Sequence, residues 1–177
     1  MNGEDFGLHP FTLIRGKEEK MDHSTRQELA VNYFSSGYNC CQSLVLAFAD
    51  LLPANREMLS KIACSFGGGM GRLREVCGAV SGMFFVIGLL YGYSDPETGP
   101  RKAEHYARIQ DLAHQFEEKN GSIICRELLG LACKHDSSVP AERTAEYYRK
   151  RPCKNLVGDA AEILDRYISE HPPIPCA

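Results

Sequence analysis

The chain has 177 residues, the size of one ordinary domain, and its apolar fraction of 44% can bury a core without disulfides. Its net charge is −3 and no basic stripe runs along it, so we expect neither nucleic acid nor an anionic membrane surface as a partner. The most apolar run, Val76 to Gly92, is shorter than the ~20 residues that span a bilayer and is interrupted by small residues. It therefore predicts a buried helix and not a membrane protein.

The first twenty residues are polar, contain Pro10 and lack the apolar segment of a secretory signal. We expect residues 1–20 to form a tail ahead of a single helical domain that covers residues 21–177, in a protein of the cytoplasm. Met21 is followed by good helix N-caps, Asp22 and Ser24, so one hypothesis is that translation starts at Met21.

Helical patterns dominate the rest of the chain. Apolar residues spaced by three and four, bounded by capping residues, glycines or prolines, predict helices. The predicted ranges are 25–35, 40–52, 56–66, 75–91, 101–119, 123–129 (a short helix or extended piece), 140–149 and 153–169. Glycines at 67, 68, 69 and 71 predict a loop with unusual backbone angles, the glycine-rich loop (residues 67–71). No stretch alternates with a period of two, so we predict an all-α fold, an irregular helical bundle around the apolar, glycine-containing helix at 75–91.

Cys77 carries the strongest chemical signal. It lies in the first turn of the central helix, where unpaired N–H groups and the helix dipole favour an anion such as a thiolate. Arg72 and Arg74 precede it, and we expect them to lower the pKa of its thiol. Gly78 and Gly82 leave the sulfur uncovered or let a neighbouring helix pack closely. The alternative is that Cys77 is a small apolar residue of a tightly packed helix.

Three other cysteines have related surroundings. Cys40 opens a helix directly after a good capping residue, and Cys153 opens another with Arg151 close by. Cys125 lies next to Arg126 among apolar residues, which fits a buried thiol as well as a functional one.

The remaining cysteines and the histidines give weaker signals. We expect Cys41 and Cys64 to pack in the core, and Cys133 and Cys176 to be incidental exposed thiols. The six histidines are scattered and no two have the spacing of a helical metal pair. No CxxC occurs, so any cysteine cluster has to be assembled in space.

Several segments resemble, in order, the bacterial and archaeal C-GCAxxG-C-C family over about residues 33–164. They are Asn39-Cys40, FGGGMGRLREVCGAVSG, GSIICRELLG and the run CKNLVGDAAEIL that begins at Cys153. The resemblance places the four family cysteines on Cys40, Cys77, Cys125 and Cys153, and the CGAxxG element on residues 77–82. It implies a helical fold and a redox role, and it implies an association with a transport system because family genes often lie beside transporter genes. It names no substrate.

The leading hypothesis is a thiol-based redox-active protein, a thiol–disulfide oxidoreductase that requires no cofactor. Cys77 is the nucleophilic thiolate, and one or more of Cys40, Cys125 and Cys153 resolve it as a disulfide. Electrons pass between the protein and an unidentified redox partner or a small thiol. Two alternatives stay open: a zinc or iron–sulfur site held by the same four cysteines, and a non-catalytic accessory protein of a transport system. The sequence is compatible with an oligomer and does not fix the oligomeric state.

Three geometric expectations follow. The four family cysteines face one common pocket. Cys77 is the most acidic accessible thiol in the chain. Along the central helix, Val80, Phe84, Ile87 and Leu90 lie in the core, and Gly78 and Gly82 touch a neighbouring helix.

Overall fold

The computed structural model describes residues 25–96, 99–132 and 136–173. The predicted tail, the hypothetical start at Met21 and the cysteines Cys133 and Cys176 lie outside the described residues. Within them, helices form every regular element, and the only β-type pairing is one antiparallel bridge between Val76 and Ile124. The all-α prediction is confirmed.

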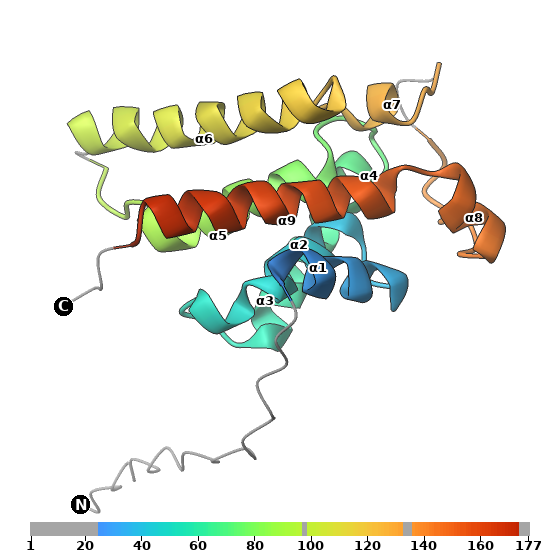
Figure 1. The fold of residues 1–177 in the computed structure, drawn as a ribbon, viewed down its shortest axis with the longest axis horizontal. Helices are drawn as coiled ribbons and strands as arrows, with labels where there is room; N and C mark the ends of the chain where they lie inside the picture. The colour runs from blue at the N-terminus through green and yellow to red at the C-terminus, as the bar shows by residue number, and fades with distance from the viewer. Residues whose placement is uncertain (1–24, 97–98, 133–135, 174–177) are drawn as a thin grey trace, which may run out of the picture.

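The helices follow the chain in a simple order (Figure 1). The α-helices and the two 3₁₀ turns, η1 and η2, are α1 (Arg26–Ser35), α2 (Cys40–Ala47), η1 (Ala49–Leu51), α3 (Arg56–Ala63), η2 (Cys64–Phe66), α4 (Gly67–Met70), α5 (Gly78–Tyr91), α6 (Gly99–Asn120), α7 (Cys125–Leu128), α8 (Ala145–Lys150) and α9 (Cys153–Glu170).

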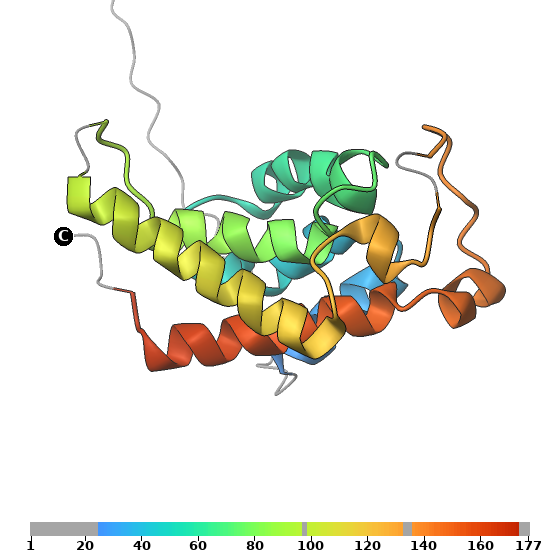
Figure 2. The same cartoon turned by 90° about the horizontal axis from the view of Figure 1, so that it is seen from above.

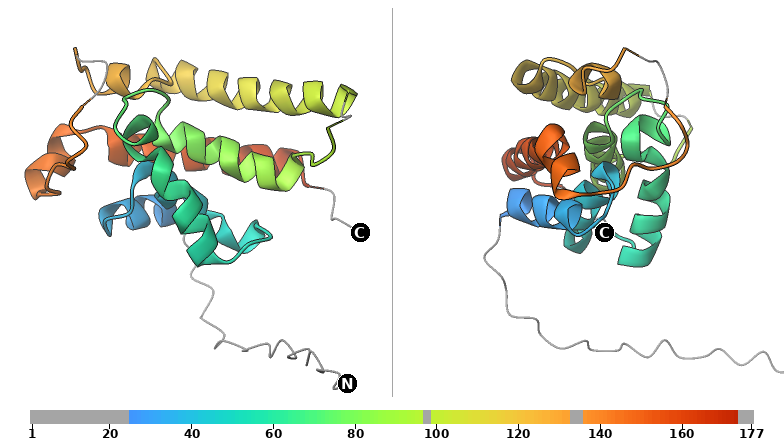
Figure 3. Two further views of the ribbon diagram at one scale, coloured as in Figure 1. Left: turned by 180° about the vertical axis from the view of Figure 1, so that it is seen from behind. Right: turned by 90° about the vertical axis from the view of Figure 1, so that its right-hand side faces the viewer.

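The bundle has three layers, with α5 and α9 side by side in the middle (Figures 1 and 3). The long helix α6 lies over both of them on one side and crosses them obliquely (Figure 2). On the other side, α2 packs on α5 and α1 packs on α9. The first residues of α5 and α9 lie at the same end of the molecule, close to α4, α7 and α8 (Figure 1).

The central helix α5 carries no charged residue. Two of the four residues that were predicted to lie in its core face are fully buried. Val80 and Ile87 are fully buried, whereas Phe84 and Leu90 are partly buried and pack against the edge of the core. Burial on most sides of this helix agrees with its uniformly apolar sequence.

Two glycines let α5 approach α2 closely. A Cβ atom on Gly82 would lie 2.8 Å from Cδ2 of Leu44 and 3.3 Å from the carbonyl oxygen of Cys41. A Cβ atom on Gly78 would lie 2.9 Å from the carbonyl oxygen of Phe66. The predicted close packing at both glycines is confirmed.

Most predicted helix starts coincide with side-chain caps. Thr25 caps α1, Asn39 caps α2 and Asn55 caps α3, each by accepting a hydrogen bond from a backbone N–H of the first turn. The helix predicted over 140–149 is shorter than expected. It begins at Ala145 because the hydroxyl of Thr144 accepts from the Tyr147 N–H and caps it there.

None of the helices that the structure describes combines the length and the apolar character needed to cross a membrane.

Candidate functional site

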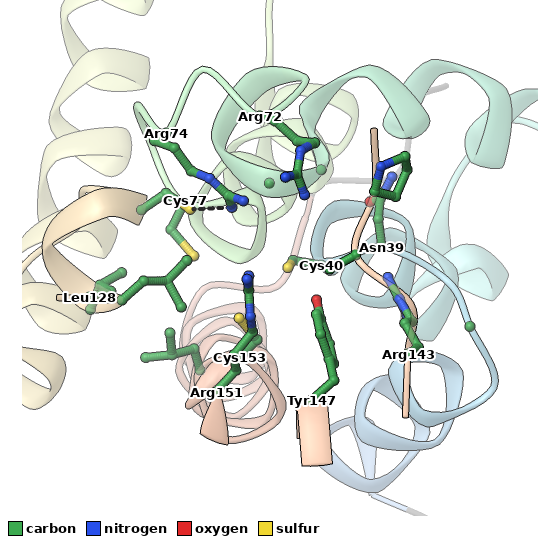
Figure 4. A pocket seen from close by; sticks show the side chains of 18 of the residues that line it. Asn39, Cys40, Arg72, Arg74, Cys77, Leu128, Arg143, Tyr147, Arg151 and Cys153 are labelled. Atoms are coloured by element: carbon green, nitrogen blue, oxygen red, sulfur yellow. Dashed lines mark hydrogen bonds between the residues drawn. The ribbon is translucent and has the colours of Figure 1, made fainter. Parts of the chain in front are cut away.

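A cavity of about 350 Å³ lies at the end of the bundle where the middle helices begin. Its lining includes Cys40, Cys77, Cys125 and Cys153, which come from four different segments of the chain (Figure 4). The predicted convergence of these cysteines on one pocket is confirmed.

Each of the four cysteines stands at the start of a helix. Cys40 and Cys153 are the first residues of α2 and α9, and Cys125 is the first residue of α7. Cys77 is the N-cap of α5, with extended backbone angles of φ −54° and ψ 134°. The central helix therefore starts three residues later than predicted, and the N-terminal ends of the long helices α5 and α9 both face the cavity.

Backbone hydrogen bonds join the segment of Cys77 to the segment of Cys125. The N–H of Cys77 donates to the carbonyl of Ile123 at 2.8 Å, and the N–H of Cys125 donates to the carbonyl of Glu75 at 2.6 Å. These bonds flank the bridge between Val76 and Ile124. Residues 75–77 pair with a distant segment, which explains why they do not continue α5 as helix.

The glycine-rich loop lies against two of the four cysteines, Cys40 and Cys125. Gly68, Gly69 and Gly71 have φ values of +67°, +69° and +62°, as the glycine pattern predicts. A Cβ atom on Gly69 would lie 2.6 Å from Cβ of Cys125, so the loop needs glycine there for both space and backbone conformation. A hydrogen bond from the backbone of Gly68 lowers the pKa of Cys40, although other interactions raise it further.

Arg72 and Arg74, which were expected to lower the pKa of Cys77, bind to other groups. Both guanidinium groups pair with Asp136, at 2.8 Å and 2.7 Å between nitrogen and oxygen. Arg74 is buried and also donates to the sulfur of Cys125 at 3.7 Å. The pairing with Asp136 was not predictable from the sequence because Asp136 lies 62 residues after Arg74. The two arginines hold the pKa of Asp136 below its usual range.

The prediction that Cys77 is the most acidic accessible thiol is wrong for this structure. Its side chain is only 5% exposed, and burial raises its pKa above the ordinary range of a cysteine. Backbone N–H groups of Ala79 and Val80, in the first turn of α5, act in the opposite direction but do not offset the burial. The N–H groups at the start of α5 lower the pKa of Cys77, but the loss of water on burial raises it by more.

Cys40 and Cys153 line the cavity as interacting thiols whose surroundings differ. Interaction with Cys40 lowers the pKa of Cys153, and the charge of Arg151 lowers it further. Interaction with Cys153 and burial raise the pKa of Cys40. Cys153 also stands at the N-terminus of the 18-residue helix α9, which favours a thiolate there. The surroundings of Cys153 therefore favour the thiolate form more than those of Cys40 do.

A family model described as "Putative redox-active protein (C_GCAxxG_C_C)" matches residues 38–167. The chain belongs to this C_GCAxxG_C_C family. No curated protein and no solved structure matches the chain. The four cysteines that the sequence resemblance assigns to the family all line the cavity, and the matched range 38–167 contains all four.

Two further arginines line the family site, one of which the sequence did not single out. Arg151 lies over the ring of Tyr147, with 4.7 Å between the guanidinium carbon and the ring centroid. Arg143 lies over the ring of Phe34 at 5.0 Å and donates to the carbonyls of Phe34 and Tyr38. Arg143 lies in the stretch without regular structure before α8, within the range 140–149 that was predicted as a helix.

Cys64 also lines the cavity and is exposed, so its predicted place in the core is wrong. The helix α3 ends at Ala63, and Cys64 begins the 3₁₀ turn η2, in which no residue is buried. Cys41, in contrast, is fully buried between α2 and its neighbours, as predicted. The adjacent cysteines at 40 and 41 thus divide into one cavity residue and one core residue.

The proposed alternative of a metal centre gains no support from the side-chain geometry. Within residues 25–96, 99–132 and 136–173, no three histidine, cysteine, aspartate or glutamate side chains are arranged to hold a metal ion. The four family thiols share a cavity without forming one coordination sphere.

Proposed function

We propose that the chain is a dithiol–disulfide redox protein in which Cys153 is the attacking thiolate and Cys40 is the resolving thiol. The observations that carry this proposal are that both thiols line the same cavity and that Cys153 begins the 18-residue helix α9, whose N-terminus favours a thiolate. Interaction with Cys40 and the charge of Arg151 lower the pKa of Cys153. A nucleophile that ionises first, next to a thiol that keeps its proton, is the arrangement that ordered thiol–disulfide exchange requires.

The reaction has two steps that balance. The Cys153 thiolate attacks one sulfur of a disulfide substrate, forms a mixed disulfide and releases the first thiolate of the substrate. Cys40 then loses its proton and attacks the sulfur of Cys153, which forms the Cys40–Cys153 disulfide and releases the second thiolate. Two cysteines are oxidised, the substrate gains two electrons, and its two thiolates take up the two protons that the cysteines lose.

Cys77, the nucleophile that the sequence predicts, takes a later step in this proposal. Its neutral thiol lies close enough to Cys40 and Cys125 for a charge on either of them to raise its pKa. After loss of its proton, Cys77 attacks the sulfur of Cys40 in the new disulfide and releases Cys153 as a thiolate. Cys125 then resolves the Cys40–Cys77 bond by attack on Cys77, so that the oxidising equivalents rest on a second pair and Cys153 is free again.

The test is a map of the disulfides formed on controlled oxidation. The reduced protein is treated with one equivalent of diamide, free thiols are blocked with iodoacetamide at several times, and peptides are read by mass spectrometry. The first disulfide is expected between Cys40 and Cys153, and Cys153→Ser should abolish it.

The matched control for the map is Cys64→Ser, because Cys64 lines the cavity but has no part in the proposed exchange. It should leave the first disulfide unchanged. A first disulfide that excludes Cys153, or a two-thiol oxidation that survives in Cys153→Ser at the wild-type rate, would contradict the proposal. The association with a transport system stays a prediction, since no contact of the described residues bears on it.

A further inference from the structure

The family thiols are accessible to small molecules and not to a folded protein. Cys77, Cys125 and Cys153 are 5%, 6% and 9% exposed, and Cys40 is half-buried. A disulfide of another protein carries backbone on both sides of its sulfurs, so it cannot enter a cavity of about 350 Å³. That volume is typical of a small-molecule site.

The cavity carries a surplus of positive charge. Four arginines line it, and no aspartate or glutamate is among its described lining residues. Arg72 and Arg74 share the carboxylate of Asp136. Arg143 and Arg151 form no ion pair with any described residue, and Figure 4 shows Arg151 pointing into the space between Cys40 and Cys77. Guanidinium groups that have no carboxylate partner within the protein are well suited to bind the carboxylates of a ligand.

The cavity also has an apolar side, which Leu128, Leu129 and Leu156 provide. A peroxide or a simple oxyanion is not much larger than a water molecule, and it would leave most of this volume and all of the apolar surface unused. An organic molecule with a short hydrocarbon part and an anionic end would use both sides.

We propose that the substrate of this site is a small organic disulfide that carries carboxylates, with Arg143 and Arg151 binding the carboxylates and presenting a sulfur to Cys153. This inference rests on the proposed dithiol function and adds to it the charge and size of the oxidant. The exchange follows the two steps given above, and the products are two carboxylate-bearing thiols and the Cys40–Cys153 disulfide.

Arg151 has two separable effects on the reaction. Its charge lowers the pKa of Cys153, and this activates the thiolate toward every disulfide alike. Binding of a carboxylate, in contrast, speeds up only the anionic substrate. The ratio of rates for substrates of different charge therefore reports binding, and the activation of the thiolate cancels out of it.

The experiment compares three small disulfides of similar length: 3,3′-dithiodipropionate with charge −2, 2-hydroxyethyl disulfide with charge 0, and cystamine with charge +2. Oxidation of the reduced protein is followed by acid quench, alkylation and intact mass. Each rate is divided by the rate of the same disulfide with N-acetylcysteine amide, which removes differences in intrinsic reactivity.

The normalised rate of the dianionic disulfide is expected to exceed that of the neutral one by about tenfold or more, and cystamine should be slowest. Arg151→Gln and Arg143→Gln should each reduce this ratio. Arg149→Gln is the matched control because Arg149 lies on α8 but is exposed and does not line the cavity, and it should leave the ratio unchanged. Since Arg143 also bonds to two backbone carbonyls, Arg151→Gln and the wild-type ratio carry the test if Arg143→Gln fails to fold.

Equal normalised rates for the three disulfides would overturn the inference, as would a preference that both arginine variants retain. Such a result would leave the dithiol function standing if the Cys40–Cys153 disulfide still forms. Failure of that disulfide with all three compounds and with diamide would instead overturn the proposed function itself.

Discussion

The two glycines Gly82 and Gly88 offer a direct test of how α5 packs. Both lie in the same helix and both gain about 0.5–1 kcal/mol of helix propensity on replacement by alanine. The new methyl group at residue 82 would lie 2.8 Å from Cδ2 of the fully buried Leu44, whereas the one at residue 88 would meet nothing within 4 Å. Overpacking of a closed core costs about 1–3 kcal/mol, so Gly82→Ala should be less stable than Gly88→Ala by roughly that amount.

The difference is measurable as two thermal unfolding curves followed by circular dichroism. For a domain of this size, 1 kcal/mol corresponds to a shift in Tm of about 2–4 °C, so the variants should differ by roughly 2–12 °C. Gly88→Ala should unfold at or above the wild-type temperature. Gly82→Leu adds three more carbons to the same contact and should be worse than Gly82→Ala. Equal Tm values for the two alanine variants would refute the close contact between α5 and α2.

Three further predictions concern charge and access. Alkylation of Cys153 should reach half its maximal rate below the ordinary titration range of a cysteine, because its pKa is lowered, and Arg151→Gln should move this midpoint to higher pH in a pH series of iodoacetamide rates. Asp136→Asn should lower stability to urea at neutral pH, since two arginines of the cavity lose their partner. The folded pKa of Asp136 is lowered, so the difference from wild type should shrink as the pH falls through that value below about 4. A short iodoacetamide pulse on native reduced protein should label the exposed Cys64 well before the fully buried Cys41, which should react only on unfolding.

The helices were predictable because their signals are local. The side chains of Asn39 and Asn55 accept hydrogen bonds from backbone N–H groups three residues further along, so each helix start is signalled within a few residues of sequence. The start of α5 was misplaced because residues 75–77 pair with 123–125, a contact between segments nearly fifty residues apart. The sequence around residues 75–77 contains no pattern that indicates pairing with residues 123–125.

The candidate site follows the same rule. The helix-start position of Cys40 and Cys153 is local and pointed correctly to a shared pocket. The relative acidity of the thiols was not predictable, because it depends on burial and on which side chain lies opposite. Arg74 lies only three residues before Cys77 in sequence, but its side chain reaches Cys125. The loss of water at Cys77 raises the pKa that the helix start would lower.

The two glycines of the CGAxxG element have a structural reason that also concerns the site. Gly82 sets how closely α5 approaches Leu44 in the middle of α2. Gly78, one turn earlier, does the same at the first residue of α2, where an added Cβ would lie 3.1 Å from Cβ of Cys40. A side chain at residue 78 would push α2 away and carry Cys40 with it. The glycines that the sequence associated with access to Cys77 thus set how α2 packs on α5, and this packing determines where Cys40 lies relative to Cys153.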